Sequence, residues 1–165
     1  MGVKYGLPPV SRSDARLFIL GSLPSDASLA ESRYYAHPTN QFWRLLGNSI
    51  GEELQQLSYE KRLERLMERR IGLWDVIASA SRNGSLDQSI RNAEHNRIEH
   101  LLKDFAQLRA IAFNGSRAAS VGRKLIGEPP PHLLLIDLPS SSAANTKSIE
   151  EKAISWDRLG QFELS

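Results

Sequence analysis

Short apolar runs alternate with amphipathic stretches along the chain, and this pattern predicts an α/β protein. The runs at 16–20, 110–113 and 132–136 have the length and composition of buried strands. Apolar residues at helical spacing predict helices over 40–50, 52–70, 94–105 and 116–126. Strands that alternate with helices favour a three-layer α/β/α fold with a central, mainly parallel sheet.

Turn and capping signals divide these elements. Ser28 and Glu31 have the spacing of a capping box, Asn83-Gly84 marks a turn, and Ser148 is placed to begin a last helix. In an open α/β sheet the ligand site lies where loops leave the carboxyl ends of the strands. The candidate segments are therefore 21–25, 114–116 and 138–145.

The chain has 165 residues, which predicts a single domain over 1–165. It contains no cysteine, which excludes disulfides, thiolate metal sites and cysteine nucleophiles. His95 and His100 lack a useful metal-ligand spacing, so we expect no metal. The net charge of +2 and a pI of 9.0 are compatible with a polyanionic partner. With no long apolar segment, we expect a cytoplasmic protein, nucleoid-associated in a prokaryote, with no membrane contact.

Five segments at the predicted loops and strand ends carry a resemblance to a known family. They read GSLPS (21–25), YYAHPTNQFW (34–43), GLWDV (72–76), FNG (113–115) and LPSSSAAN (138–145). In this order they resemble the uracil-DNA glycosylase superfamily, and more closely its hypoxanthine-DNA (DNA-deoxyinosine) glycosylase branch. The resemblance implies a uracil-DNA glycosylase-like fold and base excision repair of deaminated bases, hypoxanthine or uracil, flipped out of DNA.

The resemblance also implies roles for residues near the first two strands. Asn40 corresponds to the catalytic position, where its amide oxygen would orient the attacking water. Tyr35 corresponds to the aromatic residue that stacks on the extruded base, and Asn114 to the residue that reads the base edge. Gly21 and Ser22 form the first base-binding loop, in which other branches carry a polar Asp or Asn.

The last loop would hold DNA. Its members with hydroxyl, amide or basic groups suited to phosphate contacts are Ser140, Ser141, Ser142, Asn145 and Lys147. Ala143 stands where the family usually has proline, and the loop has no histidine to stabilise a departing base. Arg117, Arg123 and Lys124 are further candidates for phosphate contact. We expect a monomeric glycosylase that needs no cofactor and acts on DNA with deaminated bases.

Each of these residues also has a purely structural interpretation. Asn40 is a good helix cap, Tyr35 a possible core aromatic, Asn114 with its glycine a plain turn, and the serine run a surface loop. A non-catalytic nucleic-acid-binding module would not need Asn40 and Asn114 to converge on one pocket. A nucleoside hydrolase of the same architecture would lack salt-dependent affinity for DNA.

Overall fold

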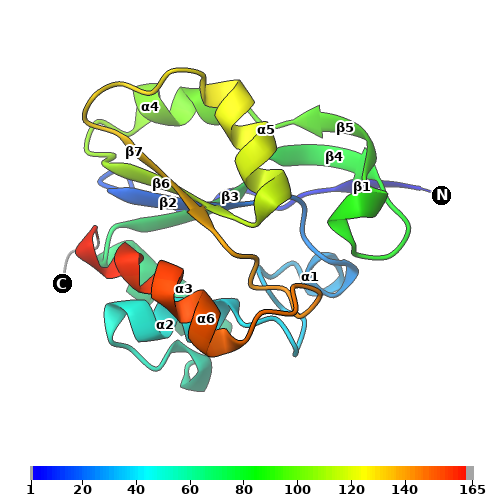
Figure 1. Cartoon of the computed structure of the whole chain (residues 1–165), viewed down its shortest axis with the longest axis horizontal. Coiled ribbons are helices and arrows are strands. Elements are labelled where there is room, and N and C mark those ends of the chain that lie inside the picture. Colours follow the sequence, from blue (N-terminus) through cyan, green and yellow to red (C-terminus); the bar gives the residue numbers. More distant parts are fainter. Residues whose placement is uncertain (1, 163–165) are drawn as a thin grey trace.

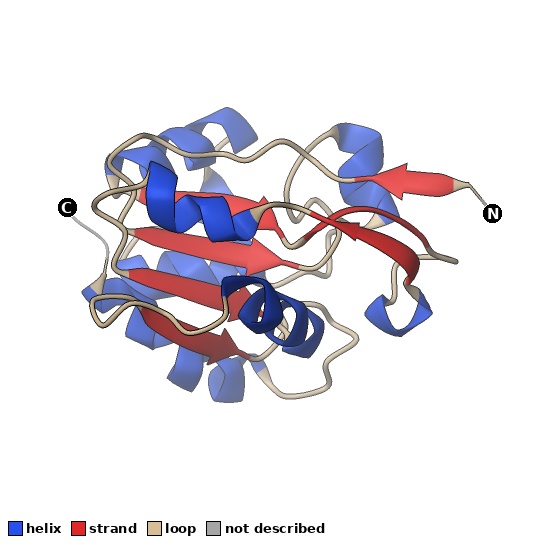
Figure 2. Cartoon of the chain, turned by 90° about the horizontal axis from the view of Figure 1, so that it is seen from above, coloured by secondary structure: helices blue, strands red, loops and turns tan. Residues whose placement is uncertain are grey.

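The centre of the structure is a four-stranded parallel sheet, described by a computed structural model over residues 2–162. Its strands are β2 (Leu17–Gly21), β3 (Ile71–Asp75), β6 (Ala110–Asn114) and β7 (Leu134–Leu138). They lie side by side in the order β3-β2-β6-β7 (Figure 2). Every residue of β2 and β6 is buried, which explains their continuous apolar sequences. The predicted α/β fold with a parallel sheet is confirmed.

Helices cover both faces of this sheet (Figure 1). One face carries α2 (Phe42–Ile50), α3 (Tyr59–Glu68) and α6 (Ile149–Trp156), and the other carries α4 (Leu101–Asp104) and α5 (Ser116–Ile126). Strand β2 supplies both cores, because Leu17 and Ile19 face the first layer whereas Phe18 and Leu20 face the second. Within residues 2–162, no helix is long and apolar enough to cross a membrane.

A second, antiparallel sheet adjoins the first and was not expected. It contains β1 (Val3–Tyr5), β4 (Ile77–Ser81) and β5 (Arg91–His95) in the order β1-β4-β5. The predicted helix over 94–105 is therefore wrong at its start. Only its second half is helical, as η3 (Ile98–His100) followed by α4. The η2 turn (Asp87–Ser89) lies between β4 and β5.

Several helix boundaries differ from those predicted. The stretch 52–70 divides into η1 (Leu54–Gln56) and α3, because the Ser58 hydroxyl caps a new helix at the backbone N–H of Lys61. Helix α1 (Asp26–Glu31) is capped by Ser25, which corrects the capping box expected at Ser28. The predicted bounds of α5 are confirmed, and η4 (Asp157–Gln161) follows α6. The single domain over 1–165 stays a prediction, with residues 1 and 163–165 outside the described part.

Candidate active site

A cavity of about 700 Å³ opens at the carboxyl edge of the parallel sheet. Its walls come from the loops that follow β2, β6 and β7, together with the 34–40 segment and residues 85–88 between β4 and β5. The three segments predicted from the strand ends thus meet at one place. The proposed catalytic and base-binding residues and four of the five last-loop candidates line this cavity; the candidates for phosphate contact that do not line it are Lys147, Arg117, Arg123 and Lys124.

Asn40, Ser141 and Asn114 form a connected hydrogen-bond network on the cavity wall. The Ser141 hydroxyl donates to Asn40 Oδ1 at 2.8 Å and accepts from Asn114 Nδ2 at 2.9 Å. The backbone N–H of Ser141 donates to Asn114 Oδ1, also at 2.9 Å. Asn114 and Ser141 are buried, so these bonds are shielded from competing water. The network fixes both asparagine amides relative to each other.

Asn40 precedes Gln41, the N-cap residue of α2, and binds the first N–H of this helix while it takes part in the network. Its Oδ1 accepts the backbone N–H of Phe42 at 2.9 Å, at the start of α2, in addition to the Ser141 hydroxyl. Both acceptor positions of the amide oxygen are therefore occupied. Among the described residues, the Asn40 amide nitrogen has no hydrogen-bond partner. The group left available toward the cavity is the amide N–H₂, whereas the sequence-based expectation assigned the water to the oxygen.

The serine loop after β7 separates into two kinds of position. Ser141 is buried and its backbone carbonyl accepts the N–H of Gln41 at 2.9 Å. Ser140 and Ser142 are half-buried, and each hydroxyl accepts a backbone N–H two residues later. A phosphate contact stays a prediction for all three serines. The geometry favours it for the two outer serines, since the Ser141 hydroxyl already has two partners.

A buried lysine holds this loop against the segment that carries Asn40. Lys152 of α6 is fully buried and donates to Gln41 Oε1 at 2.9 Å and to the Ser142 carbonyl at 3.2 Å. Burial lowers the pKa of Lys152. No carboxylate accepts from Lys152 in the described chain. Its position is thus set by neutral oxygens of two loops that are remote in sequence.

Tyr35 lines the cavity and has a left-handed backbone, φ 55°. Its ring stacks on Phe42 with centroids 3.8 Å apart and planes 10° apart. Phe42 thus covers one face of the Tyr35 ring. The stacking role of Tyr35 on a base stays a prediction, and the contact with Phe42 gives the ring a rigid support.

Gly21 makes room for two polar groups. A Cβ atom at Gly21 would lie 2.6 Å from Asp75 Oδ1 and 2.9 Å from the Tyr35 hydroxyl oxygen. Both distances are closer than real Cβ contacts allow. The glycine is therefore required by the approach of Asp75 and Tyr35 rather than by its own dihedral angles. Next to it, the Ser22 hydroxyl donates to Asp87 Oδ1 at 2.6 Å.

Asp75 is a functional candidate that sequence reasoning missed. It ends β3, is 3% exposed and lines the cavity. Burial, followed by the nearby carboxylate of Asp87, raises the pKa of Asp75 to about 7, although Arg82 acts in the opposite direction. The available signal was its position in the GLWDV segment, where a single carboxylate ends an apolar run.

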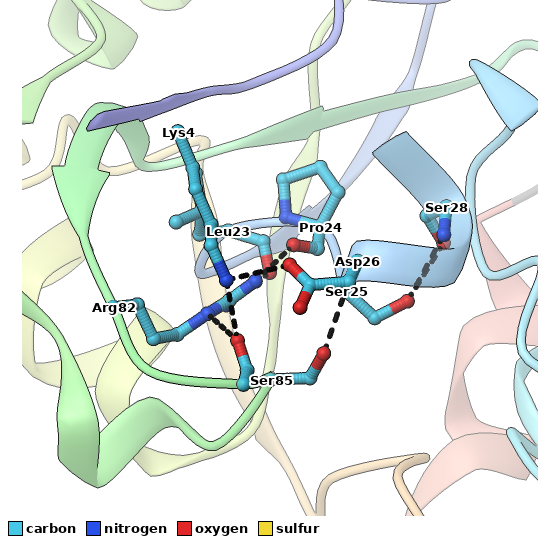
Figure 3. Close-up of polar contacts among 9 residues, drawn as sticks. Lys4, Leu23, Pro24, Ser25, Asp26, Ser28, Arg82 and Ser85 are labelled. Atoms are coloured by element: carbon cyan, nitrogen blue, oxygen red, sulfur yellow. Dashed lines mark hydrogen bonds and ion pairs between the residues drawn. The ribbon is translucent and has the colours of Figure 1, made fainter. Parts of the chain in front are cut away.

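The loop between β4 and β5 is tied to the GSLPS loop by polar contacts (Figure 3). Arg82 is buried and donates to the carbonyls of Leu23, Pro24 and Gly84. Lys4 of β1 bridges Asp26 and the Gly84 carbonyl, at 2.6 and 2.7 Å. These contacts hold residues 85–88 against the cavity.

Other sequence candidates lie away from this site. Arg123 and Lys124 occupy the last turn of α5, whereas Ser116 at its first turn reaches the cavity. Arg123 instead pairs with Asp137 at 3.0 Å. In the part of the chain that the structure describes, no group of three or more His, Asp or Glu residues is placed to hold a metal ion.

The fold and the site together define a class of protein, an α/β enzyme with paired asparagines at the carboxyl edge of its sheet. The model of the uracil DNA glycosylase superfamily matches residues 8–160. The chain therefore belongs to this superfamily, and the resemblance seen in the sequence is confirmed.

Named relatives and a solved structure are consistent with membership of this superfamily. A hypoxanthine DNA glycosylase of Methanosarcina acetivorans is 42% identical over 157 residues, which cover 95% of this chain and 98% of the relative. A second one, from Methanosarcina barkeri, is 42% identical over 159 residues, covering 93% and 95%. A solution NMR structure from M. acetivorans, described as a candidate uracil DNA glycosylase, matches with a TM-score of 0.85 and 41% identity over 97% of this chain and 98% of that one.

Proposed function

We propose that the protein is a monofunctional DNA glycosylase that removes deaminated bases, hypoxanthine and/or uracil, from DNA. In this reaction the C1′–N bond breaks with its electron pair going to the base, and water adds to C1′. The base leaves after taking up a proton, and an abasic site remains. Family membership and the hypoxanthine DNA glycosylases among the relatives support this reaction.

The observation that carries the proposal is the network of Asn40, Ser141 and Asn114 on one cavity wall. Hydrolysis of an N-glycosidic bond needs a positioned water at the sugar and hydrogen-bond donors at the departing base. In the proposed arrangement Asn40 serves the water and Asn114 the base, with Ser141 fixing the distance between them. A plain binding module has no need for such convergence.

The proposed selectivity follows from hydrogen-bond chemistry. Deamination replaces the amino donor of adenine or cytosine by a carbonyl acceptor, so a pocket that presents donors favours the deaminated base. An undamaged base would leave buried donors unpaired, at about 1–3 kcal/mol each. The outer serines, Asn145 and exposed Lys147 are proposed to contact phosphates without reading sequence. We propose that the active form is a monomer.

Oligonucleotides with one deoxyinosine or one deoxyuridine, in single and double strands, test this function. Incubation followed by alkali cleaves the strand wherever an abasic site has formed. We expect cleavage at deoxyinosine with the wild type and none with Asn40→Ala in the same incubation time. Hydrolysis of free inosine without excision from DNA would favour the nucleoside hydrolase. Salt-dependent DNA binding without either reaction would favour a non-catalytic module.

A further inference from the structure

Two buried polar atoms of cavity-lining residues have no partner in hydrogen-bonding geometry in the described chain, although the Asn114 side chain lies near one of them, the Tyr35 hydroxyl. They are Asp75 Oδ2 and the Tyr35 hydroxyl oxygen. Leaving such atoms unpaired costs about 1–3 kcal/mol each in a folded protein, and unpaired groups in natural structures call for a specific reason. Both residues line the cavity, and both polar groups approach the space left open by Gly21. Asp75 and Tyr35 thus have hydrogen-bonding capacity at one place that no group of the described chain uses.

Asp75 and Asn114 lie at the carboxyl ends of two strands that flank the same central strand, β2. Asp75 ends β3 and Asn114 ends β6. Gly21, which ends β2, is the register partner of Asp75 and separates the two side chains. Asn114 already shares two hydrogen bonds with Ser141, so its amide has only part of its capacity left. A base in the cavity therefore needs polar partners beyond Asn114.

We propose that Asp75, in its neutral carboxyl form, and the Tyr35 hydroxyl hydrogen-bond the edge of the extruded base. A neutral carboxyl carries one donor and one acceptor side by side. Hypoxanthine presents an N1–H donor beside the O6 acceptor, and uracil an N3–H donor beside O4, so either edge pairs with a neutral carboxyl in two bonds. An ionised carboxyl has no donor and would repel the carbonyl oxygen. This inference rests on the proposed function and names the group that completes its base pocket.

Burial, followed by the charge of Asp87, raises the pKa of Asp75 to about 7, so its neutral form predominates below that pH. Asp87 on the η2 turn is a second carboxyl near it, and its own Oδ1 accepts from Ser22. Arg82, after β4, is the cation that opposes Asp87, but its guanidinium is directed to backbone carbonyls. From β2 and the 34–40 segment, Asp75 meets the neutral groups of Gly21 and Tyr35. His37 is a further titratable residue of the cavity wall, and it is exposed.

The test is the pH dependence of kcat/KM on a deoxyinosine duplex between about pH 6 and 9. The kcat/KM of the wild type should fall as pH rises through the Asp75 pKa of about 7. Above that pKa the fall should approach tenfold per pH unit. Asp75→Asn keeps a donor and an acceptor but cannot ionise, so its profile should lose this decline. Asp75→Ala should lower kcat/KM about 10- to 100-fold at pH 6. Tyr35→Phe keeps the ring and should lower it about tenfold.

Control variants separate Asp75 from its neighbours. His37→Gln should keep the decline of kcat/KM with rising pH, because the proposal assigns this decline to ionisation of Asp75. Asp87→Asn removes the charge that raises the Asp75 pKa and should move the decline to lower pH. The inference is overturned if Asp75→Asn retains the wild-type decline, or if Asp75→Ala matches wild type at every pH. The Asp75→Asn result decides the matter even if the alanine variant fails to fold.

A binding measurement distinguishes failure of this inference from failure of the proposed function. A duplex with 2′-fluoro-deoxyinosine resists hydrolysis, so its affinity relative to an undamaged duplex can be measured at pH 6 and 8.5 without turnover. The relative affinity should fall at the higher pH for wild type and not for Asp75→Asn. If wild type excises no lesion, the proposed function fails. If the affinity ratio is the same at both pH values for wild type, the role of Asp75 fails.

Discussion

Asn40 and Ser141 lie 101 positions apart in the chain, and the hydroxyl of Ser141 donates to the amide oxygen of Asn40 at 2.8 Å. The backbone N–H of Gln41, the next residue after Asn40, donates back to the Ser141 carbonyl. These two bonds join the loop after β7 to the start of α2. The rate of base excision should therefore depend on a serine that does not need to touch DNA.

Replacing Ser141 by alanine tests this dependence. Ser141→Ala removes the hydroxyl between the two asparagines, and we expect kcat to fall by about tenfold or more with little change in DNA affinity. Ser142→Ala, in the neighbouring half-buried position, is the matched control and should weaken DNA binding with little effect on kcat. Single-turnover excision and gel-shift titrations measure the two quantities. A loss of affinity alone in Ser141→Ala would return this serine to the phosphate-contacting group.

Asn40 offers a pair of variants that separate its two roles. Asn40→Asp keeps an oxygen for the Phe42 N–H and the Ser141 hydroxyl, but it loses the free amide N–H₂. Asn40→Ala loses both. We expect excision to fall on the order of 10²-fold or more in the alanine variant, with DNA affinity nearly unchanged. Near-wild-type turnover of Asn40→Ala would reduce this residue to a helix cap.

Asn114→Asp should lower both excision and selectivity. The exchange removes the amide donor and places a second acceptor where a hypoxanthine or uracil carbonyl would lie. We expect a fall on the order of 10²-fold in excision of deoxyinosine, together with poorer discrimination against the undamaged duplex. Competition between lesion and undamaged duplexes measures the second effect. Unchanged discrimination would assign base reading to other residues of the pocket.

The buried Asp75 carboxyl should also affect stability. Its pKa is about 7 in the folded protein and near 3.8 in the unfolded chain. The folded state thus keeps a proton that the unfolded state has lost, and the free energy of unfolding falls as pH rises between these two values. Asp75→Asn should be more stable than wild type by about 2–4 kcal/mol at pH 8 and not at pH 4. Urea unfolding at both pH values measures this difference, and equal stabilities at pH 8 would contradict it.

Chelation provides a test of the hydrolytic step. The cavity offers amides, hydroxyls and carboxyls and, within residues 2–162, no cluster suited to a metal ion. Excision of hypoxanthine should therefore proceed at the same rate with excess EDTA, after dialysis against the chelator. Loss of activity that returns on addition of a divalent cation would refute metal-independent hydrolysis.

The elements that were predicted correctly are those whose own residues show a clear hydrophobic pattern. Strand β6 is a continuous apolar run, and α5 starts and ends where its amphipathic pattern does. Strand β5 has no such signal, because Arg91 to His95 are mostly exposed and pair with β4 through an irregular register. Its conformation comes from the neighbouring strand rather than from its own residues.

The site residues also divide into those visible in sequence motifs and those that become distinct only in the folded chain. Asn40 and Asn114 were found because they belong to motifs, and the cavity brings them together. Ser141 could not be distinguished from Ser140 and Ser142, since three identical residues become different only when one of them is buried. Asp75 was missed because the GLWDV segment shows a carboxylate at the end of an apolar run, whereas its burial and its unpaired oxygen are defined only by the folded chain.

The cavity wall at residues 85–88 is attached to the rest of the site by side chains and backbone carbonyls, outside the parallel sheet. Lys4 and Arg82 donate to the Gly84 carbonyl, and Lys4 also pairs with Asp26. The Ser22 hydroxyl donates to Asp87, and the Ser85 hydroxyl accepts the backbone N–H of Asp26. Insertions or deletions in this connection would change the width of the cavity without altering the register of β2, β3, β6 and β7. The size of the base admitted can thus change during evolution through the length of one surface loop, while the residues proposed to cleave the glycosidic bond keep their positions.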